Sequence, residues 1–188
     1  WMAENLRVTK YNNGVSLTNV TNDGQWETFS SGAYASYENK TTNDCPYGKI
    51  YNWRAVINIP NICPAGWHVP TDAEWNVMMA YLDQSYSPTT EGIQSSIAGG
   101  QMKSTGIQYW QTSNTAATNN SGFSGLPGGR KDDASIFVNL NTRGYWWSNP
   151  SSPNINNLLN RALFNSNGNV NRVSVQEEVG ASVRCVKD

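Results

Sequence analysis

The sequence has few charged residues and no long apolar run. Asp, Glu, Lys and Arg make up 14% of its 188 residues, and the formal net charge is −1. A chain this close to neutrality has no basic surface for a polyanion, so we expect no nucleic-acid partner. No stretch approaches the roughly 18 apolar residues of a membrane-spanning helix, so we expect no membrane insertion either.

Motifs for zinc binding and for export are also missing. His68 is the single histidine, and the cysteines form no C-x-x-C pair, so no zinc site of the usual kind is expected. No basic segment followed by an apolar segment opens the chain at Trp1, so we expect no signal peptide in it. That is typical of a mature exported chain and equally of a truncated one.

The three cysteines predict one disulfide and one spare thiol. Cys63 precedes the main predicted helix and Cys185 lies in the last predicted strand, so a bridge between them would close a very long loop. We predict this pair. Cys45 is then either a buried thiol or one half of a bridge between chains. Because disulfides persist in oxidising compartments, the bridge predicts a secreted or cell-surface protein.

Aromatic and small polar residues are abundant instead. The chain contains 8 Trp and 9 Tyr among many Asn, Ser, Thr and Gly residues. Long helices need more Ala, Leu, Glu and Lys than this chain offers. Its length suits one domain, so the composition predicts a single loop-rich domain of mainly β or α+β class with large aromatic anchors.

One helix is specified tightly by local chemistry. Pro70 keeps the preceding residue extended, and Thr71 with Glu74 forms a T-x-x-E capping box. One apolar stripe follows at helical spacing, formed by Trp75, Met78, Met79 and Leu82. The pattern predicts a core helix that ends at Leu82.

Weaker patterns predict the other elements. Residues 92–105 suit a short second helix interrupted at Gly99-Gly100, and residues 123–130 suit a strand followed by a glycine turn. Asn167-Gly168 is a hairpin turn signal. Further strands are expected at 47–53, 136–140, 144–148, 162–164, 170–175 and 181–186.

Motifs spread along the chain resemble one family. They are WMAENLR, TKYNNG, YGKIYNWRAV, ICPAGWHVPTDAEW, AGGQMKSTG, SGFSGLPGGR, GYWWS and SVRCVKD. In this order they resemble the Fibrobacter succinogenes major paralogous domain over residues 1–188, without the strand pair that usually precedes WMAENLR. The resemblance implies a secreted or surface protein of α+β class with a C-type-lectin-like fold: two helices, small antiparallel sheets and long loops. VPTDAEW also resembles a turn of the formylglycine-generating enzymes, which share that fold.

The residues that carry activity in related branches are not found here. The enzyme branch relies on a cysteine pair for copper chemistry, and the lectin branch holds calcium with E-P-N or Q-P-D loops. We therefore expect a non-catalytic protein without a cofactor, with one open question about calcium. Asp132 and Asp133 are weak candidate ligands, and a solvated turn is the alternative for both.

Self-association is the function that we favour, narrowly, from the sequence. Trp1 and Met2 make an apolar start, Cys45 is spare, and the missing strand pair would leave a sheet edge or groove open to another strand. The prediction is a structural or adhesive surface module, such as a filament subunit joined by its N-terminal segment or by strand exchange.

Carbohydrate binding is the alternative function. Trp110, Tyr109 and Trp26 lie in polar loops, where exposed aromatic faces would stack on sugars of a polysaccharide. The competing interpretation is that all three are buried anchors, because aromatic residues dominate protein cores.

Overall fold

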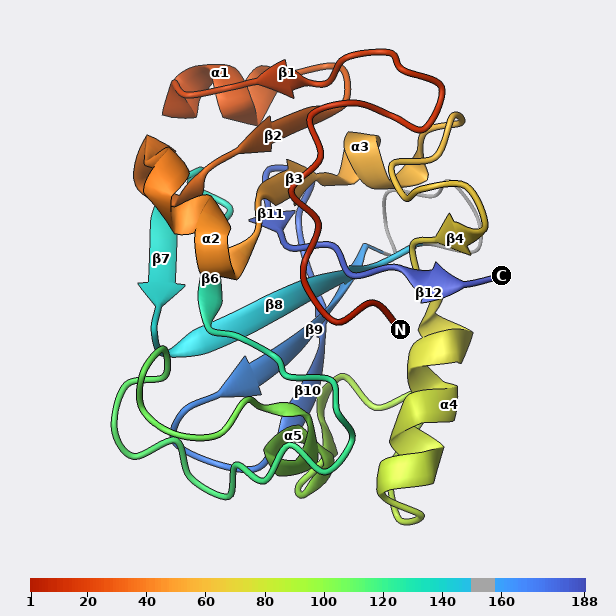
Figure 1. Ribbon diagram of the computed structural model, residues 1–188, viewed down its shortest axis with the longest axis vertical. Coiled ribbons are helices and arrows are strands. Elements are labelled where there is room, and N and C mark those ends of the chain that lie inside the picture. The colour runs from red at the N-terminus through yellow and green to blue at the C-terminus, as the bar shows by residue number, and fades with distance from the viewer. Residues whose placement is uncertain (150–157) are drawn as a thin grey trace.

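The computed structural model describes residues 1–149 and 158–188, and it confirms the α+β class (Figure 1). Among these described residues, one helix is longer than six residues, namely α4 (Asp72–Leu82). The shorter described helices are α1 (Asp23–Thr28), α2 (Asp44–Tyr47), α3 (Trp53–Ile57) and α5 (Ala98–Met102), with the 3-10 turns η1 (Tyr37–Asn39) and η2 (Thr41–Asn43). Within the described residues, no helix is long and apolar enough to cross a membrane.

The strands form one large sheet and one small sheet. The large sheet has ten strands in the order β1-β2-β3-β11-β6-β8-β9-β10-β5, with β7 beside β6, and β12 pairs with β4 separately. The pairs β1/β2 and β6/β8 are parallel and the others are antiparallel, so the large sheet is mixed. The expectation of small, purely antiparallel sheets is therefore wrong, because the main sheet is large and contains parallel pairs. The bounds are β1 (Thr18–Asn19), β2 (Ala33–Ala35), β3 (Ile50–Asn52), β4 (Trp67–His68), β5 (Gly92–Ser95), β6 (Gly128–Lys131), β7 (Phe137–Leu140), β8 (Arg143–Ser148), β9 (Leu159–Phe164), β10 (Val170–Ser174), β11 (Gly180–Ala181) and β12 (Val186–Lys187).

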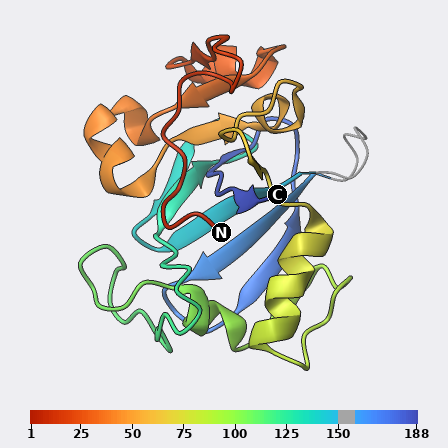
Figure 2. The same ribbon diagram turned by 45° about the vertical axis from the view of Figure 1, so that its right-hand side comes forward.

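Strand β8 separates two hydrophobic cores. Its side chains alternate in direction, so Tyr145 and Trp147 enter one core while Trp146 enters the other. The second core packs α4 and α5 against the sheet through Trp75, Met79 and Met102 (Figure 2). Because both faces of β8 are covered by a core, the three consecutive aromatic residues 145–147 are all buried.

Helix α4 begins and packs as the sequence predicts. The Thr71 hydroxyl accepts from the Glu74 amide, and the Glu74 carboxylate accepts from the Thr71 amide, which confirms the capping box. Asp72 has a second role that the sequence does not reveal. It accepts from Arg161 at 2.6 Å and from Arg172 at 3.0 and 3.1 Å, so the helix start is tied to β9 and β10.

Close packing explains where the second predicted helix differs. Residues 92–95 form β5, and α5 begins at Ala98 with Gly99 and Gly100 inside it rather than interrupting it. A Cβ on Gly99 would lie 2.1 Å from the Asn169 carbonyl oxygen, and one on Gly100 would lie 2.4 Å from the Ala116 carbonyl oxygen. The glycines are therefore needed for helix packing.

Two further strand predictions need correction. Gly128 and Gly129, expected as a turn after a strand, pair inside β6 with Leu140 and Gly144 respectively. Residues 181–186, expected as one strand, are divided between β11 and β12. Between them Ser182 bridges to β8, where its amide donates to the Tyr145 carbonyl at 3.1 Å. The predicted hairpin at residues 167–168 is confirmed between β9 and β10.

The predicted disulfide between Cys63 and Cys185 is present, with both cysteines buried. It joins positions 122 residues apart and is compatible with an exported protein. The chain start lies beside it, because the Met2 amide donates to the Cys185 carbonyl at 2.9 Å. The first residues are thus part of the fold (Figure 1).

Removing the disulfide tests its share of the stability. The Cys63→Ala/Cys185→Ala variant should lose about 4–5 kcal/mol of unfolding free energy, because a very long loop is no longer closed in the unfolded chain. Urea unfolding followed by tryptophan fluorescence measures the loss. Cys45→Ala is the control and should match the parent chain, since Cys45 is an exposed free thiol; an equal loss in both would contradict the assignment.

His68 links the small sheet to α4. Its ring nitrogens lie 2.6 Å from the Asp188 carboxylate and 2.7 Å from the Glu74 carboxylate. The hydrogen bond to Asp188 is the largest effect and raises the pKa of His68. Burial opposes it, and the hydrogen bond and charge of Glu74 raise the pKa further. The charged imidazole is therefore favoured in the folded state.

The raised pKa predicts a pH dependence of stability. A His68 contribution is fully present below the unfolded pKa of 6.5 and is lost as pH rises through the higher folded value. Unfolding free energy should therefore fall between about pH 6 and pH 8, and His68→Gln should remove that part of the slope. Chemical unfolding at several pH values measures it; an unchanged slope in the variant would show that another group is responsible.

Candidate functional site

A buried lysine fixes the long loop between α5 and β6. Lys103 is fully buried, and its ammonium donates to the carbonyls of Thr115, Phe164 and Asn167 at 2.7, 2.8 and 2.9 Å. Burial lowers the pKa of Lys103 to about 8, so the group is still mainly charged at neutral pH. Its three N–H groups hold the loop to the end of β9 and to the following turn.

Trp110 is a second anchor of the same loop. Its side chain is 1% exposed, and its indole N–H lies 3.1 Å from both the Ser104 hydroxyl and the Gly125 carbonyl. The expectation that Trp110 stacks on a sugar is therefore wrong. A buried indole needs a hydrogen-bond acceptor, and the two ends of this loop supply it.

Tyr109, the residue before Trp110, is partly exposed to solvent. Its half-buried ring packs edge-on against Tyr47 with 6.0 Å between ring centroids. The Tyr47 hydroxyl donates to the Asn141 side chain at 2.7 Å. Burial raises the pKa of the Tyr47 phenol, so that phenol stays protonated at neutral pH. The pair holds the Tyr109 ring in a fixed place.

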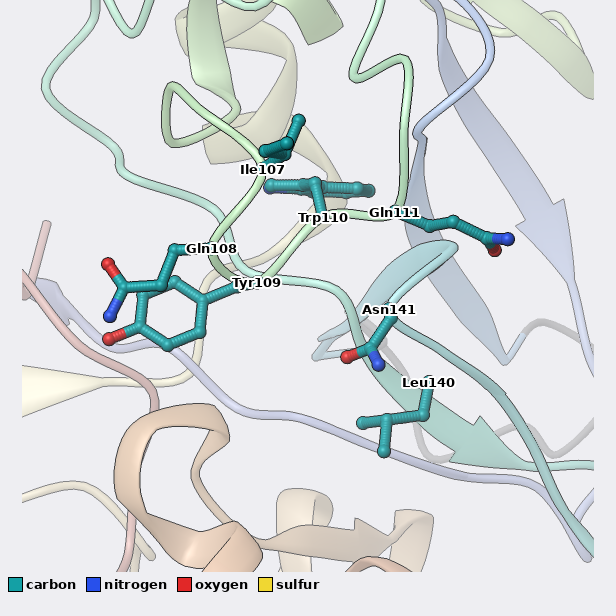
Figure 3. A pocket seen from close by; sticks show the side chains of 7 residues that line it. All are labelled: Ile107, Gln108, Tyr109, Trp110, Gln111, Leu140 and Asn141. Carbon is teal, nitrogen blue, oxygen red and sulfur yellow. The ribbon is translucent and has the colours of Figure 1, made fainter.

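A cavity of about 370 Å³ lies beside this pair, and we call it the Tyr109 pocket. Its side chains combine amides with apolar groups (Figure 3). Gln108 and Tyr109 point the same way from the loop, whereas Gln111 points away from them. The lining residues are Ile107, Gln108, Tyr109, Trp110, Gln111, Leu140 and Asn141.

A second cavity of about 450 Å³ shares Tyr109 and lies toward the chain start. We call it the Arg184 pocket, after the buried guanidinium among its walls. Cys45 lies there as an exposed thiol, so its predicted alternative as a buried thiol is wrong. The lining residues are Ala3, Glu4, Asn5, Arg7, Cys45, Pro46, Ser104, Tyr109, Ser124, Leu126 and Arg184.

Trp26 does not join Tyr109 in a site. It lies in α1, at the end of the molecule opposite the loop of residues 103–127 (Figure 1). The residue is 3% exposed, and its indole N–H donates to the Glu178 carbonyl at 2.8 Å. The expectation of an exposed, sugar-stacking Trp26 is also wrong, because this ring fills a core under β2 and β3.

Trp1 and Met2 pack on their own chain. The Trp1 ring centroid lies 4.5 Å from that of Trp75 and 5.7 Å from that of Phe123. Met2 contacts the core that contains the disulfide. The expectation that these residues form a segment free to enter a neighbour is therefore not met: both are half-buried where they are.

Asp132 and Asp133 lie in the turn between β6 and β7. The Asp132 carboxylate accepts from the amides of Ala134 at 3.1 Å and Ile136 at 2.9 Å, and Asp133 is exposed. In the part of the chain that the structure describes, no group of three or more acidic, His or Cys side chains could hold a metal ion. The carboxylate of Asp132 thus closes the turn through these two backbone amides.

A family model, the Fibrobacter succinogenes major domain, matches residues 1–187. The chain belongs to this family. No curated protein and no solved structure matched it. Membership in the Fibrobacter succinogenes major domain family confirms the resemblance that the motifs indicated. The family name specifies no activity.

Sequence reasoning indicates two of the residues that line the Tyr109 pocket, Tyr109 and the buried Trp110, and misses the others. Tyr109 was found because it stands in a polar loop. Gln108, Gln111 and Asn141 resemble many other amides in the chain, and Asn141 reaches the site only through the β7–β8 turn. Arg184 has a local signal in the sequence, since it stands between Val183 and Cys185, which are both buried.

Proposed function

We propose that the protein is a non-catalytic saccharide-binding module that uses the Tyr109 pocket. The observation that carries this proposal is the packed Tyr47–Tyr109 pair beside exposed amides on an anchored loop. A tyrosine ring can cover the apolar face of a sugar, and amide groups both donate to and accept from its hydroxyls. Binding sites commonly join apolar walls with a few polar groups in this way.

The anchoring of the loop supports the proposal. Lys103 and Trp110 fix both ends of the loop, so little conformational freedom remains to be lost when a ligand binds. The resemblance to C-type-lectin-like domains and the disulfide fit a module of a secreted or cell-surface protein. The proposed mode needs no calcium ion and no other cofactor.

Replacing Tyr109 tests the proposal. Polysaccharide and glycan arrays first identify ligands of the parent chain, and titration calorimetry then measures their affinity. Tyr109→Ala should weaken binding roughly tenfold or more, because the stacking face is lost. Ile59→Ala is the control, since Ile59 is 95% exposed and lines neither the Tyr109 pocket nor the Arg184 pocket. Equal affinity of Tyr109→Ala and the control would reject this site.

Self-association is a second candidate, favoured by an apolar groove on the outer side of α4. The groove holds about 410 Å³, and Val77 and Tyr81 along it are 71% and 86% exposed. Exposed apolar patches of this kind often mark interaction surfaces, and we propose a second copy of the chain as the partner. The groove is lined by Trp1, Glu74, Val77, Met78, Tyr81, Leu82, Ser121 and Val186.

Sedimentation velocity over a range of concentrations tests self-association. The parent chain should form dimers or larger species at high concentration. Val77→Lys/Tyr81→Lys should shift it to monomer, because two charges would be buried in the contact. Ile59→Lys is the control, since Ile59 is 95% exposed and lies outside the groove. A monomeric parent chain at every concentration would remove this candidate.

A further inference from the structure

Arg184 is a buried cation without an acidic partner. It is 1% exposed, and its guanidinium donates to the Asn5 side-chain oxygen through Nε at 3.1 Å and Nη2 at 2.8 Å. Nη1 donates to the Phe123 carbonyl. Within residues 1–149 and 158–188, no carboxylate forms an ion pair with it. Burying a charge among neutral acceptors is unfavourable, so this site favours an added anion.

Comparison with Lys103 shows why Arg184 has capacity left. The ammonium of Lys103 has three N–H groups, and three carbonyls accept from them. A guanidinium has five N–H groups in one plane, and the described residues accept three hydrogen bonds from Arg184. Burial lowers the pKa of Arg184 to about 9, which leaves it charged at neutral pH. Arg184 therefore lines the pocket with more N–H groups than the described residues accept from.

Two serine hydroxyls in the same pocket point to the same kind of ligand. The Ser104 oxygen accepts from the Trp110 indole, and the Ser124 oxygen accepts from the Asn119 side chain. Among the described residues, neither hydroxyl donates its own hydrogen to an acceptor. Two hydroxyl donors and a guanidinium around one cavity match a group that only accepts hydrogen bonds.

The net charge around the cavity also favours an anionic ligand. Glu4 and Arg7 form an ion pair at its rim and largely cancel each other, so Arg184 leaves the pocket with one net positive charge. Tyr109 borders both this cavity and the Tyr109 pocket. A saccharide that stacks on Tyr109 could thus extend a charged substituent toward Arg184.

We propose that the Arg184 pocket binds the carboxylate of an acidic saccharide, of the uronic-acid class, whose sugar ring stacks on Tyr109. This inference rests on the proposed function and specifies its ligand class. Planar guanidinium groups match carboxylates well, with paired parallel hydrogen bonds. A sulfate ester offers similar acceptor oxygens, so the experiment has to distinguish the two sources.

The test compares matched ligands on the full chain. Titration calorimetry measures binding of oligogalacturonate, of the same oligosaccharide with its carboxyl groups reduced to alcohols, and of a sulfated neutral oligosaccharide. The uronic acid form should bind at least roughly tenfold more tightly than the reduced form, because charge-assisted hydrogen bonds are lost on reduction. The difference should shrink as salt is added.

Variants of Glu4 and Arg7 at the rim test whether the uronate binds in the Arg184 pocket, and they leave the buried Arg184 unchanged. Glu4→Gln frees Arg7 and should tighten uronate binding severalfold without changing the reduced form, whereas Arg7→Gln should weaken uronate binding. Glu27→Gln and Lys10→Gln make the same net-charge changes at exposed positions outside the pocket and should have no effect.

The outcomes separate this inference from the proposed function. Equal binding of the uronate and reduced forms, with loss in Tyr109→Ala, would overturn the carboxylate subsite and leave saccharide binding intact. Tighter binding of the sulfated form than of the uronate form would replace carboxylate by sulfate and overturn the proposal as stated. No binding of any of the three forms would overturn the carboxylate subsite, and no binding on the glycan arrays would overturn the proposed function as well.

Discussion

The buried charge of Arg161 is the constraint that organises the fold. This residue lies fully buried in β9, and Asp72 at the start of α4 lies 2.6 Å from it. Burial alone would raise the pKa of Asp72, but hydrogen bonds and charge from Arg172 and Arg161 outweigh it and lower the pKa. An unpaired charge in this position would cost several kcal/mol, so the helix has to begin where Asp72 meets the sheet. The helix start, the strand register and the core between them are thus fixed together.

That arrangement leaves the loops to carry function. With α4 and α5 on one face and the disulfide-containing core on the other, the central strands have both faces covered. Among the described residues, the loop between α5 and β6 is the longest segment without a helix or strand. It is nevertheless held in place by Lys103 and Trp110, whose partners are carbonyl groups from several segments. Rigid loops on a scaffold are the usual place for recognition.

Local chemistry explains which parts of the fold could be predicted. The capping box at Thr71 and Glu74, the apolar stripe of α4 and the hairpin at Asn167-Gly168 depend on residues a few positions apart, and the structure has them all. The burial of Trp110 depends on Gly125, and the role of Asp72 depends on Arg161, so neither can be deduced from a local pattern. Motif likeness predicted the family, since the motifs retain their order along the chain.

The two buried cations near the candidate site show how a structural group differs from one available for binding. Lys103 and Arg184 are both desolvated, both have a lowered pKa and both contact aromatic rings. Burial and pKa therefore do not distinguish them. What distinguishes them is the share of N–H groups that have an acceptor. Each cation donates three hydrogen bonds to the described residues, which uses every N–H of Lys103 but not every N–H of Arg184, and Arg184 lines a cavity. A buried cation that has saturated its donors stabilises a loop, and one that has not is where an anion gains most from binding.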